Sequence, residues 1–117
     1  MVIISYKKYK GKIVPIDYSN QITEDQLKDV IHRALSSGGS VIWSRHFKES
    51  IKKRGYDSQD VNYILRFGKL IKSEFSQEHK NWTYRLKGIT VDGSKGAVVT
   101  VIVSERAIRM ITALGNV

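Results

Sequence analysis

Apolar residues in the first half of the chain recur at the three- and four-residue spacing of a helix that buries one face. The first such stretch begins after Thr23, which has Gln26 three residues later in the pattern of a capping box. The pair Gly38-Gly39 ends it, because glycine commonly follows a last helical turn. The apolar positions of this predicted helix are Leu27, Val30, Ile31, Ala34 and Leu35.

Two shorter helices are predicted after the brief apolar stretch Val41-Ile42-Trp43. Ser44 can cap the second helix, which runs to about Lys53, and Gly55 can stop it in a left-handed conformation. The third helix opens at residue 57 or 58 and closes at Gly68. Two short helices separated by a glycine turn should form a compact unit.

Beyond Gly68 the apolar pattern changes from helical to alternating, which is typical of strands. Within residues 82–87 the even positions are Trp, Tyr and Leu and the odd ones are Thr, Arg and Lys, so one face of this strand should be buried. Residues 97–103 are apolar on both faces and should form the central strand. The predicted strands are Lys69 to Ser76, Asn81 to Val91, Ala97 to Glu105 and Ala107 to Leu114.

Together these elements predict an α+β fold, with two to three N-terminal helices packed on one face of a four-stranded, mainly antiparallel sheet. The length of 117 residues fits one domain, which we assign to residues 21–117. Residues 1–20 are predicted to be a basic N-terminal arm with a short strand at residues 12–16. The arm could lie along a phosphate backbone or be a solvated terminus. Its lysines are Lys7, Lys8, Lys10 and Lys12, and Tyr6 and Tyr9 lie among them.

The charge changes the picture most, because 20 Lys and Arg stand against 11 Asp and Glu, a formal net charge of +9. The surplus is clustered, which favours a nucleic-acid partner, above all RNA, over solubility alone. No cysteine is present, and this excludes a disulfide scaffold, a zinc–thiolate site and a cysteine nucleophile. No apolar run approaches the length of a membrane span, and the N-terminus lacks the order of a secretory signal. We therefore expect a cytoplasmic protein without a membrane partner.

Short motifs from Ser44 onward resemble those of a known group of proteins. Over about residues 44–114 the chain is similar to small bacterial domains of unknown function that are grouped with the RelE/ParE-like toxins, in the barnase–EndoU–colicin–RelE-type fold. The resemblance implies helices on one face of an antiparallel sheet, with the other face open. Related domains often end in Thr-hydrophobic-aromatic, whereas Thr112 here precedes Ala-Leu. The matching motifs are Ser44-Arg45-His46-Phe47, Lys53-Arg54-Gly55-Tyr56, Ser58-Gln59-Asp60-Val61, Tyr84-Arg85-Leu86-Lys87-Gly88, Asp92-Gly93 and Ile111-Thr112.

The chemistry of such toxins, RNA cleavage without a metal, needs a base for the 2′-hydroxyl, cations for the phosphate and an acid for the leaving oxygen. His46 is the best candidate acid or base, and on a helix it shares a face with Ser50 and Lys53. It could instead be a structural histidine that packs at the start of its helix. Arg54 could bind phosphate or complement the helix dipole. His79 falls on a predicted hairpin loop and is expected to be solvated.

On the strands, Arg85 and Lys87 lie on a polar face that could contact RNA or simply face solvent. Thr112 matches the family motif, although its parity with Ile108 and Met110 favours packing. We predict no metal site and no cofactor. The candidate catalytic residues are His46, Arg54, Lys87 and Thr112, and the candidate nucleic-acid contacts are Arg45, Lys53 and Arg85.

The leading hypothesis is a toxin-like, metal-independent endoribonuclease of the RelE superfamily. Its partners would be RNA, including mRNA on the ribosome, and an acidic antitoxin or immunity protein that covers the basic face. The alternative is a non-catalytic module of the same fold that binds RNA or an acidic protein. A third reading follows from the gyrase poisons among the fold relatives: an inhibitor that targets a protein and has no nuclease activity.

Overall fold

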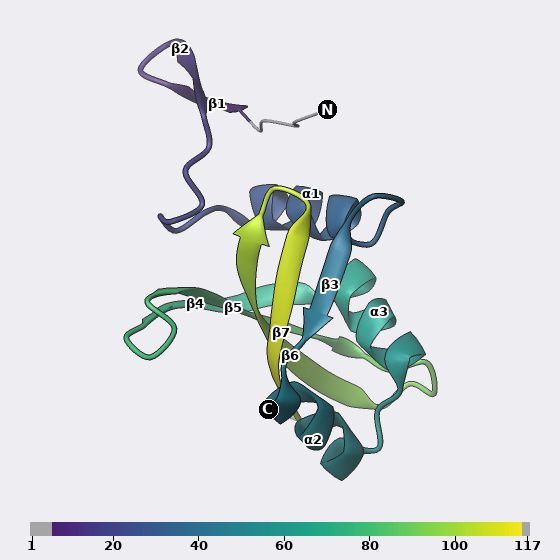
Figure 1. The fold of residues 1–117 in the computed structure, drawn as a ribbon. Coiled ribbons are helices and arrows are strands. Elements are labelled where there is room, and N and C mark those ends of the chain that lie inside the picture. Colours follow the sequence, from purple (N-terminus) through teal and green to yellow (C-terminus); the bar gives the residue numbers. More distant parts are fainter. Residues whose placement is uncertain (1–5, 116–117) are drawn as a thin grey trace.

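The computed structural model describes residues 6–115 and has the expected α+β class (Figure 1). Residues 1–5 of the predicted arm and residues 116–117 of the predicted domain lie outside the described range. The elements, in chain order, are β1 (Tyr6–Tyr9), β2 (Lys12–Pro15), α1 (Glu24–Ala34), β3 (Ser40–Trp43), α2 (Arg45–Arg54), α3 (Ser58–Phe67), β4 (Lys69–Ser76), β5 (Asn81–Ile89), β6 (Lys95–Ser104) and β7 (Ala107–Leu114).

The three helices begin and end close to where their capping residues predict. Thr23 and Gln26 form the full capping box at α1, and Ser44 accepts a hydrogen bond from the backbone N–H of Phe47 at the start of α2. Gly55 ends α2 with φ 72°, in the left-handed region that glycine tolerates best. After α1 the chain doubles back so closely that a Cβ on Gly39 would lie 2.1 Å from the carbonyl oxygen of Arg33.

The main sheet has five strands, so the prediction of four was wrong. Its order is β3-β7-β6-β5-β4, with β3 parallel to β7 and every other pair antiparallel. The sequence pattern missed β3 because Val41-Ile42-Trp43 is too short to show alternation. A parallel partner also requires a long crossover, and here that partner is the last strand of the chain.

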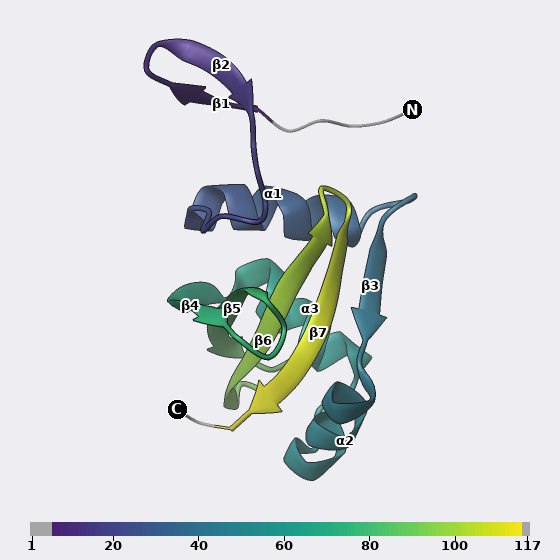
Figure 2. The same ribbon diagram turned by 60° about the vertical axis from the view of Figure 1, so that its left-hand side comes forward.

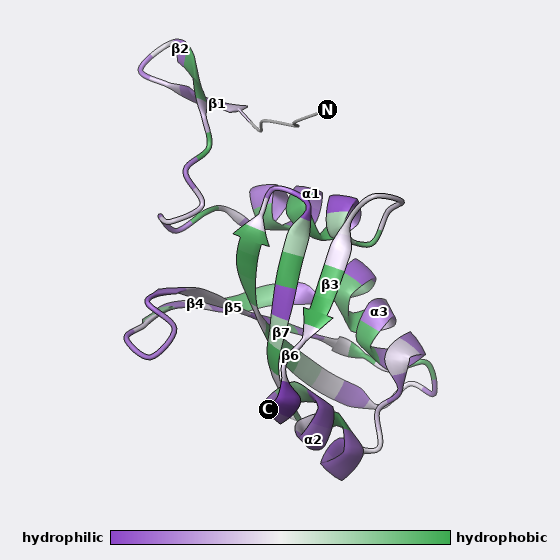
Figure 3. Cartoon of the chain, viewed as in Figure 1, coloured by the Kyte–Doolittle hydropathy of each residue, from purple (hydrophilic) through white to green (hydrophobic). Residues whose placement is uncertain are grey.

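The helices α1 and α3 cover one face of the sheet, while the opposite face is open (Figure 1). The hydrophobic core lies between these helices and the covered face, and Figure 3 shows the apolar residues concentrated along β6 and β7. The helix α2 packs beside β7, at the end of the sheet near the C-terminus. Fully buried side chains of this core include Leu27, Phe47, Ile64, Tyr84, Leu86, Val98, Ile108 and Met110.

The N-terminal arm is an antiparallel hairpin, β1–β2, instead of the single short strand that was predicted. Its turn consists of Lys10 and Gly11, with φ values of 51° and 76°. Figures 1 and 2 show the hairpin standing apart from the domain, beyond α1. The connection to α1 returns to the body, where Ile16 and Tyr18 pack against the core.

Replacing Tyr84 by Phe should lower the free energy of unfolding by about 1–3 kcal/mol, because the change leaves a buried N–H without a partner. The Tyr84 side chain is fully buried, and its hydroxyl oxygen accepts a hydrogen bond of 3.1 Å from the backbone N–H of Ile22. Burial raises the pKa of Tyr84 above its usual 10.0. The stabilisation that Tyr84 provides is therefore complete at pH values below the pKa of this tyrosine in the unfolded state. It is lost as the pH rises through the higher pKa of the folded state. Urea unfolding at neutral and alkaline pH measures both effects, and an unchanged free energy at neutral pH would contradict the bond's role.

Candidate functional site

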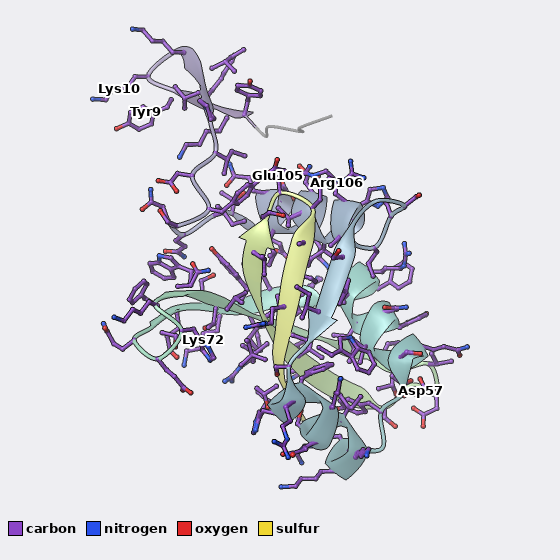
Figure 4. The ribbon with its side chains drawn as sticks, viewed as in Figure 1. Tyr9, Lys10, Asp57, Lys72, Glu105 and Arg106 are labelled. Atoms are coloured by element: carbon purple, nitrogen blue, oxygen red, sulfur yellow. The ribbon has the colours of Figure 1, made fainter. Side chains whose placement is uncertain are left out.

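A row of directly opposed residues crosses four strands on the open face of the sheet and includes two cations and one hydroxyl group. Lys72 on β4 lies opposite Arg85 on β5, Arg85 opposite Val99 on β6, and Val99 opposite Thr112 on β7. Because directly opposed residues project to the same side, these four side chains form one row. In Figure 4, Lys72 is seen beside the β4–β5 hairpin. Its ammonium lies 3.0 Å from the carboxylate of Glu74, with both side chains exposed.

Two serines, one at the start of α2 and one within it, form hydrogen bonds to the part of β7 that carries Thr112. The buried Ser50 hydroxyl accepts a 2.9 Å hydrogen bond from the backbone N–H of Ala113 and donates one of 2.8 Å to the carbonyl of Phe47. Ser44 donates its hydroxyl to the carbonyl of Ile111, at 3.3 Å. These bonds hold the first turns of α2 beside the end of β7. The exposed His46 therefore lies next to Thr112.

A cavity of about 330 Å³ opens at this junction, and two histidines line it. His46 comes from α2, and His79 comes from the turn between β4 and β5, which Figure 2 shows projecting toward the viewer in front of β6 and β7. Arg109 and Thr112, both on β7, line the floor together with Glu78 from the hairpin turn. The cavity thus combines two groups able to transfer protons with a guanidinium and a hydroxyl.

Two further hollows continue this cavity on either side. One, of about 270 Å³, is lined by His46, Lys53 and Arg54 of α2. The other, of about 430 Å³, is lined by Lys72 and Arg85 beneath the β4–β5 hairpin. Thr112 lines all three hollows, which therefore adjoin one another at β7, and we call the three together the sheet cleft.

The family model described as "Domain of unknown function (DUF4258)" matches residues 43–114, which is more than half of the chain. The chain belongs to the DUF4258 family. No curated protein and no solved structure matches the chain.

The DUF4258 segment contains α2, α3 and the strands β4 to β7, and with them every residue that lines the sheet cleft. The β1–β2 hairpin and α1 precede it. The sheet cleft is therefore built entirely within the segment that defines the family.

The DUF4258 cleft gathers most of the residues singled out from the sequence. Those that line it are His46, Lys53, Arg54, Arg85 and Thr112. Arg45 and Lys87 line none of its three hollows. The Arg45 side chain is 95% exposed and lies 3.7 Å from the carboxylate of Glu49, while Lys87 lies opposite Lys69 toward the other end of β5.

Sequence reasoning missed several residues that line the DUF4258 cleft, among them His79, Arg109 and Lys72. His79 was expected to be a solvated loop residue, and it is exposed, but its loop lies at the cleft. Local sequence carries no signal for this, since the position depends on how the β4–β5 hairpin extends from the sheet. The alternation in β7 could have revealed Arg109, which has the opposite parity to Ile108 and Met110.

A separate hollow of about 390 Å³ lies between α1 and α3. Its lysine, Lys28, donates hydrogen bonds to the carbonyls of Leu65 and Arg66 at the end of α3 and therefore serves to cap that helix. Burial lowers the pKa of Lys28.

Within residues 6–115 no group of three or more histidine, aspartate or glutamate side chains could hold a metal ion, and no helix there is long and apolar enough to cross a membrane. The sheet cleft is thus the better candidate site.

Proposed function

We propose that this DUF4258 domain is a metal-independent endoribonuclease of the RelE/ParE toxin type. The observation that supports it best is the pair His46 and His79, which line one 330 Å³ cavity together with Arg109 and Thr112. Cleavage of RNA at a 2′-hydroxyl needs one group to accept a proton and another to donate one. Two imidazoles beside cations have the right chemistry near neutral pH.

In the proposed reaction one imidazole accepts the proton of the 2′-hydroxyl while that oxygen attacks the adjacent phosphorus. The other, as imidazolium, donates its proton to the 5′-oxygen while the bond from that oxygen to phosphorus breaks. The products are a 2′,3′-cyclic phosphate and a 5′-hydroxyl end, and neither a metal nor a cofactor is consumed. The two histidines finish with their protonation states exchanged, and solvent restores them.

The cations of the cleft would stabilise the charge that develops on the phosphate. Arg109 lines the cavity of the two histidines, and Arg54 lines the neighbouring hollow that His46 also lines, so both guanidinium groups are available to phosphates bound there. Thr112 can donate a hydrogen bond to the same oxygens. Lys53, Arg85 and Lys72 would hold the neighbouring phosphates of the strand.

Arg45 and Lys87, which lie outside the three hollows, would contribute only to the long-range attraction of RNA. With a formal net charge of +9, the protein should attract polyanions strongly at low salt. The same charge would favour an acidic antitoxin or immunity protein that covers the sheet cleft. The substrate would be cytoplasmic RNA, mRNA on the ribosome included.

Incubation of the purified protein with end-labelled RNA, with and without EDTA, tests the proposal. We expect cleavage that persists in EDTA, leaves 2′,3′-cyclic phosphate and 5′-hydroxyl ends, and stops when the cleaved nucleotide carries a 2′-deoxy sugar. Free RNA and translating ribosomes should both be supplied as substrates. Salt-dependent binding without cleavage of either substrate would favour a non-catalytic RNA-binding module over an enzyme. Absence of binding at low salt would exclude both the ribonuclease and the RNA-binding module.

A further inference from the structure

The β1–β2 hairpin presents aromatic and basic side chains that the core does not use. Opposed pairs across the hairpin are Tyr6 with Pro15, Lys8 with Ile13, Lys7 with Val14 and Tyr9 with Lys12. Since opposed residues share a face, each face of the hairpin carries one tyrosine together with lysine. Both tyrosines are more than half exposed, at 55% for Tyr6 and 56% for Tyr9.

The charge of this hairpin is entirely positive. Residues 6–15 contain four lysines and no acidic residue. The ammonium groups of Lys7 and Lys10 lie 5.9 Å and 5.5 Å from the centre of the Tyr9 ring. In Figure 4, Tyr9 and Lys10 lie at the far end of the hairpin, away from the domain. An aromatic ring flanked by mobile cations is what a stacked base and its phosphates require.

The turn gives an independent reason to assign a role to these cations. Both turn residues have positive φ, which in two-residue hairpin loops favours Asn-Gly or Asp-Gly. Lys10 occupies the first position instead, with φ 51°, where a lysine is strained. A cation therefore stands at the tip of the hairpin at a conformational cost.

We propose that the β1–β2 hairpin is a second binding site, for a single strand of RNA that passes over both of its faces, so that Tyr6 and Tyr9 stack on bases on opposite faces and the four lysines contact phosphates. The hairpin lies outside the segment that the family model matches, whereas the residues of the sheet cleft lie inside it. Stacking and positive charge would also suit single-stranded DNA. The choice of RNA rests on the proposed ribonuclease function, whereas the site itself does not.

Binding of a fluorescent 12-nucleotide RNA with 2′-O-methyl sugars tests this site without interference from cleavage. The full-length Y6A/Y9A variant should bind this RNA about fivefold to a hundredfold more weakly, since each stacked base contributes appreciably. Its affinity for inorganic polyphosphate should stay unchanged, because polyphosphate has charge but no bases. The variant Tyr63→Ala, which removes a tyrosine 37% exposed on α3, is the matched control and should bind RNA like the wild type.

The lysine variant K7Q/K8Q/K10Q/K12Q should weaken the binding of both RNA and polyphosphate and reduce the salt dependence of each. Equal RNA affinity of Y6A/Y9A and wild type would overturn the proposal. So would an unchanged RNA affinity accompanied by lost binding to phosphatidylglycerol vesicles, which would make the hairpin a membrane contact. A matching DNA oligonucleotide, bound as tightly as the RNA, would overturn the choice of RNA alone. Because the sugars block cleavage, a failed ribonuclease proposal would leave this result unaffected.

Discussion

His46→Gln should reduce the rate of RNA cleavage by about 10²- to 10⁴-fold, and His79→Gln by a similar factor, because each change removes one proton-transfer group. Glutamine keeps the polarity and approximate size of the side chain without titrating near neutral pH. Both histidines are exposed, so neither change should alter the free energy of unfolding by more than about 0.5 kcal/mol. Single-turnover cleavage of a labelled RNA measures the effect.

The chain supplies a matched control for this experiment, since its third histidine, His32, is exposed on α1 and lies outside the sheet cleft. His32→Gln should cleave RNA at the wild-type rate. The wild type should show a bell-shaped dependence of rate on pH, and each cleft variant should lose one limb of it. The double variant should be little slower than either single one, because groups that act as a unit are not additive. Full activity of His79→Gln would mean that His79 takes no part in cleavage and is a solvated loop histidine.

Phe47→Ala should lower the free energy of unfolding by about 3–5 kcal/mol, the usual cost of emptying a fully buried aromatic position. The Phe47 ring has no exposed surface and packs edge to face on Trp43, with ring centres 5.3 Å apart. It is the main apolar contact near the start of α2, between Ser44 and Ser50, whose hydrogen bonds join that helix to β7. Loss of the ring should therefore loosen the helix that carries His46.

Guanidinium unfolding followed by circular dichroism measures this loss, and Phe67→Ala is the matched control. Phe67 ends α3 with 68% of its surface exposed, so the same change there should cost less than about 1 kcal/mol. Equal losses from the two variants would mean that α2 is not held by its buried face. The Phe47 variant should also cleave RNA more slowly when it is still folded, because the helix no longer holds the imidazole of His46 in position at the cleft.

Local physical chemistry accounts for the parts of the site that the sequence predicts. His46, Ser50 and Lys53 share a face because helical spacing places them there, and all three line one hollow of the sheet cleft. In β5, alternation puts Arg85 on the open face and Tyr84 in the core. These features depend on the two-residue repeat of a strand and the 3.6-residue repeat of a helix, and each repeat can be recognised within one segment of the sequence.

Contacts between distant segments account for what was missed. The strand β3 exists because it pairs with β7, and the presence of His79 and His46 at one cavity depends on how the β4–β5 hairpin extends from the sheet. No local pattern encodes either arrangement, since each joins parts of the chain that are far apart in sequence. The placement of Arg109 depends on both local pattern and distant contacts. Its opposite parity to Ile108 and Met110 can be recognised in the sequence, whereas its neighbours in the cleft cannot.

The sequence by itself determined the three helices and their N-terminal caps, the buried face of β5, the family motifs and the strongly positive charge, because each depends on neighbouring residues or on composition alone. The tertiary structure alone decided that the sheet has a fifth, parallel strand, that Lys72, Arg85 and Thr112 form one row, and that two histidines line one cavity. The physical reason is that strand pairing and helix docking are fixed by burial and hydrogen bonding between remote segments, which satisfy one another only once the whole domain has folded.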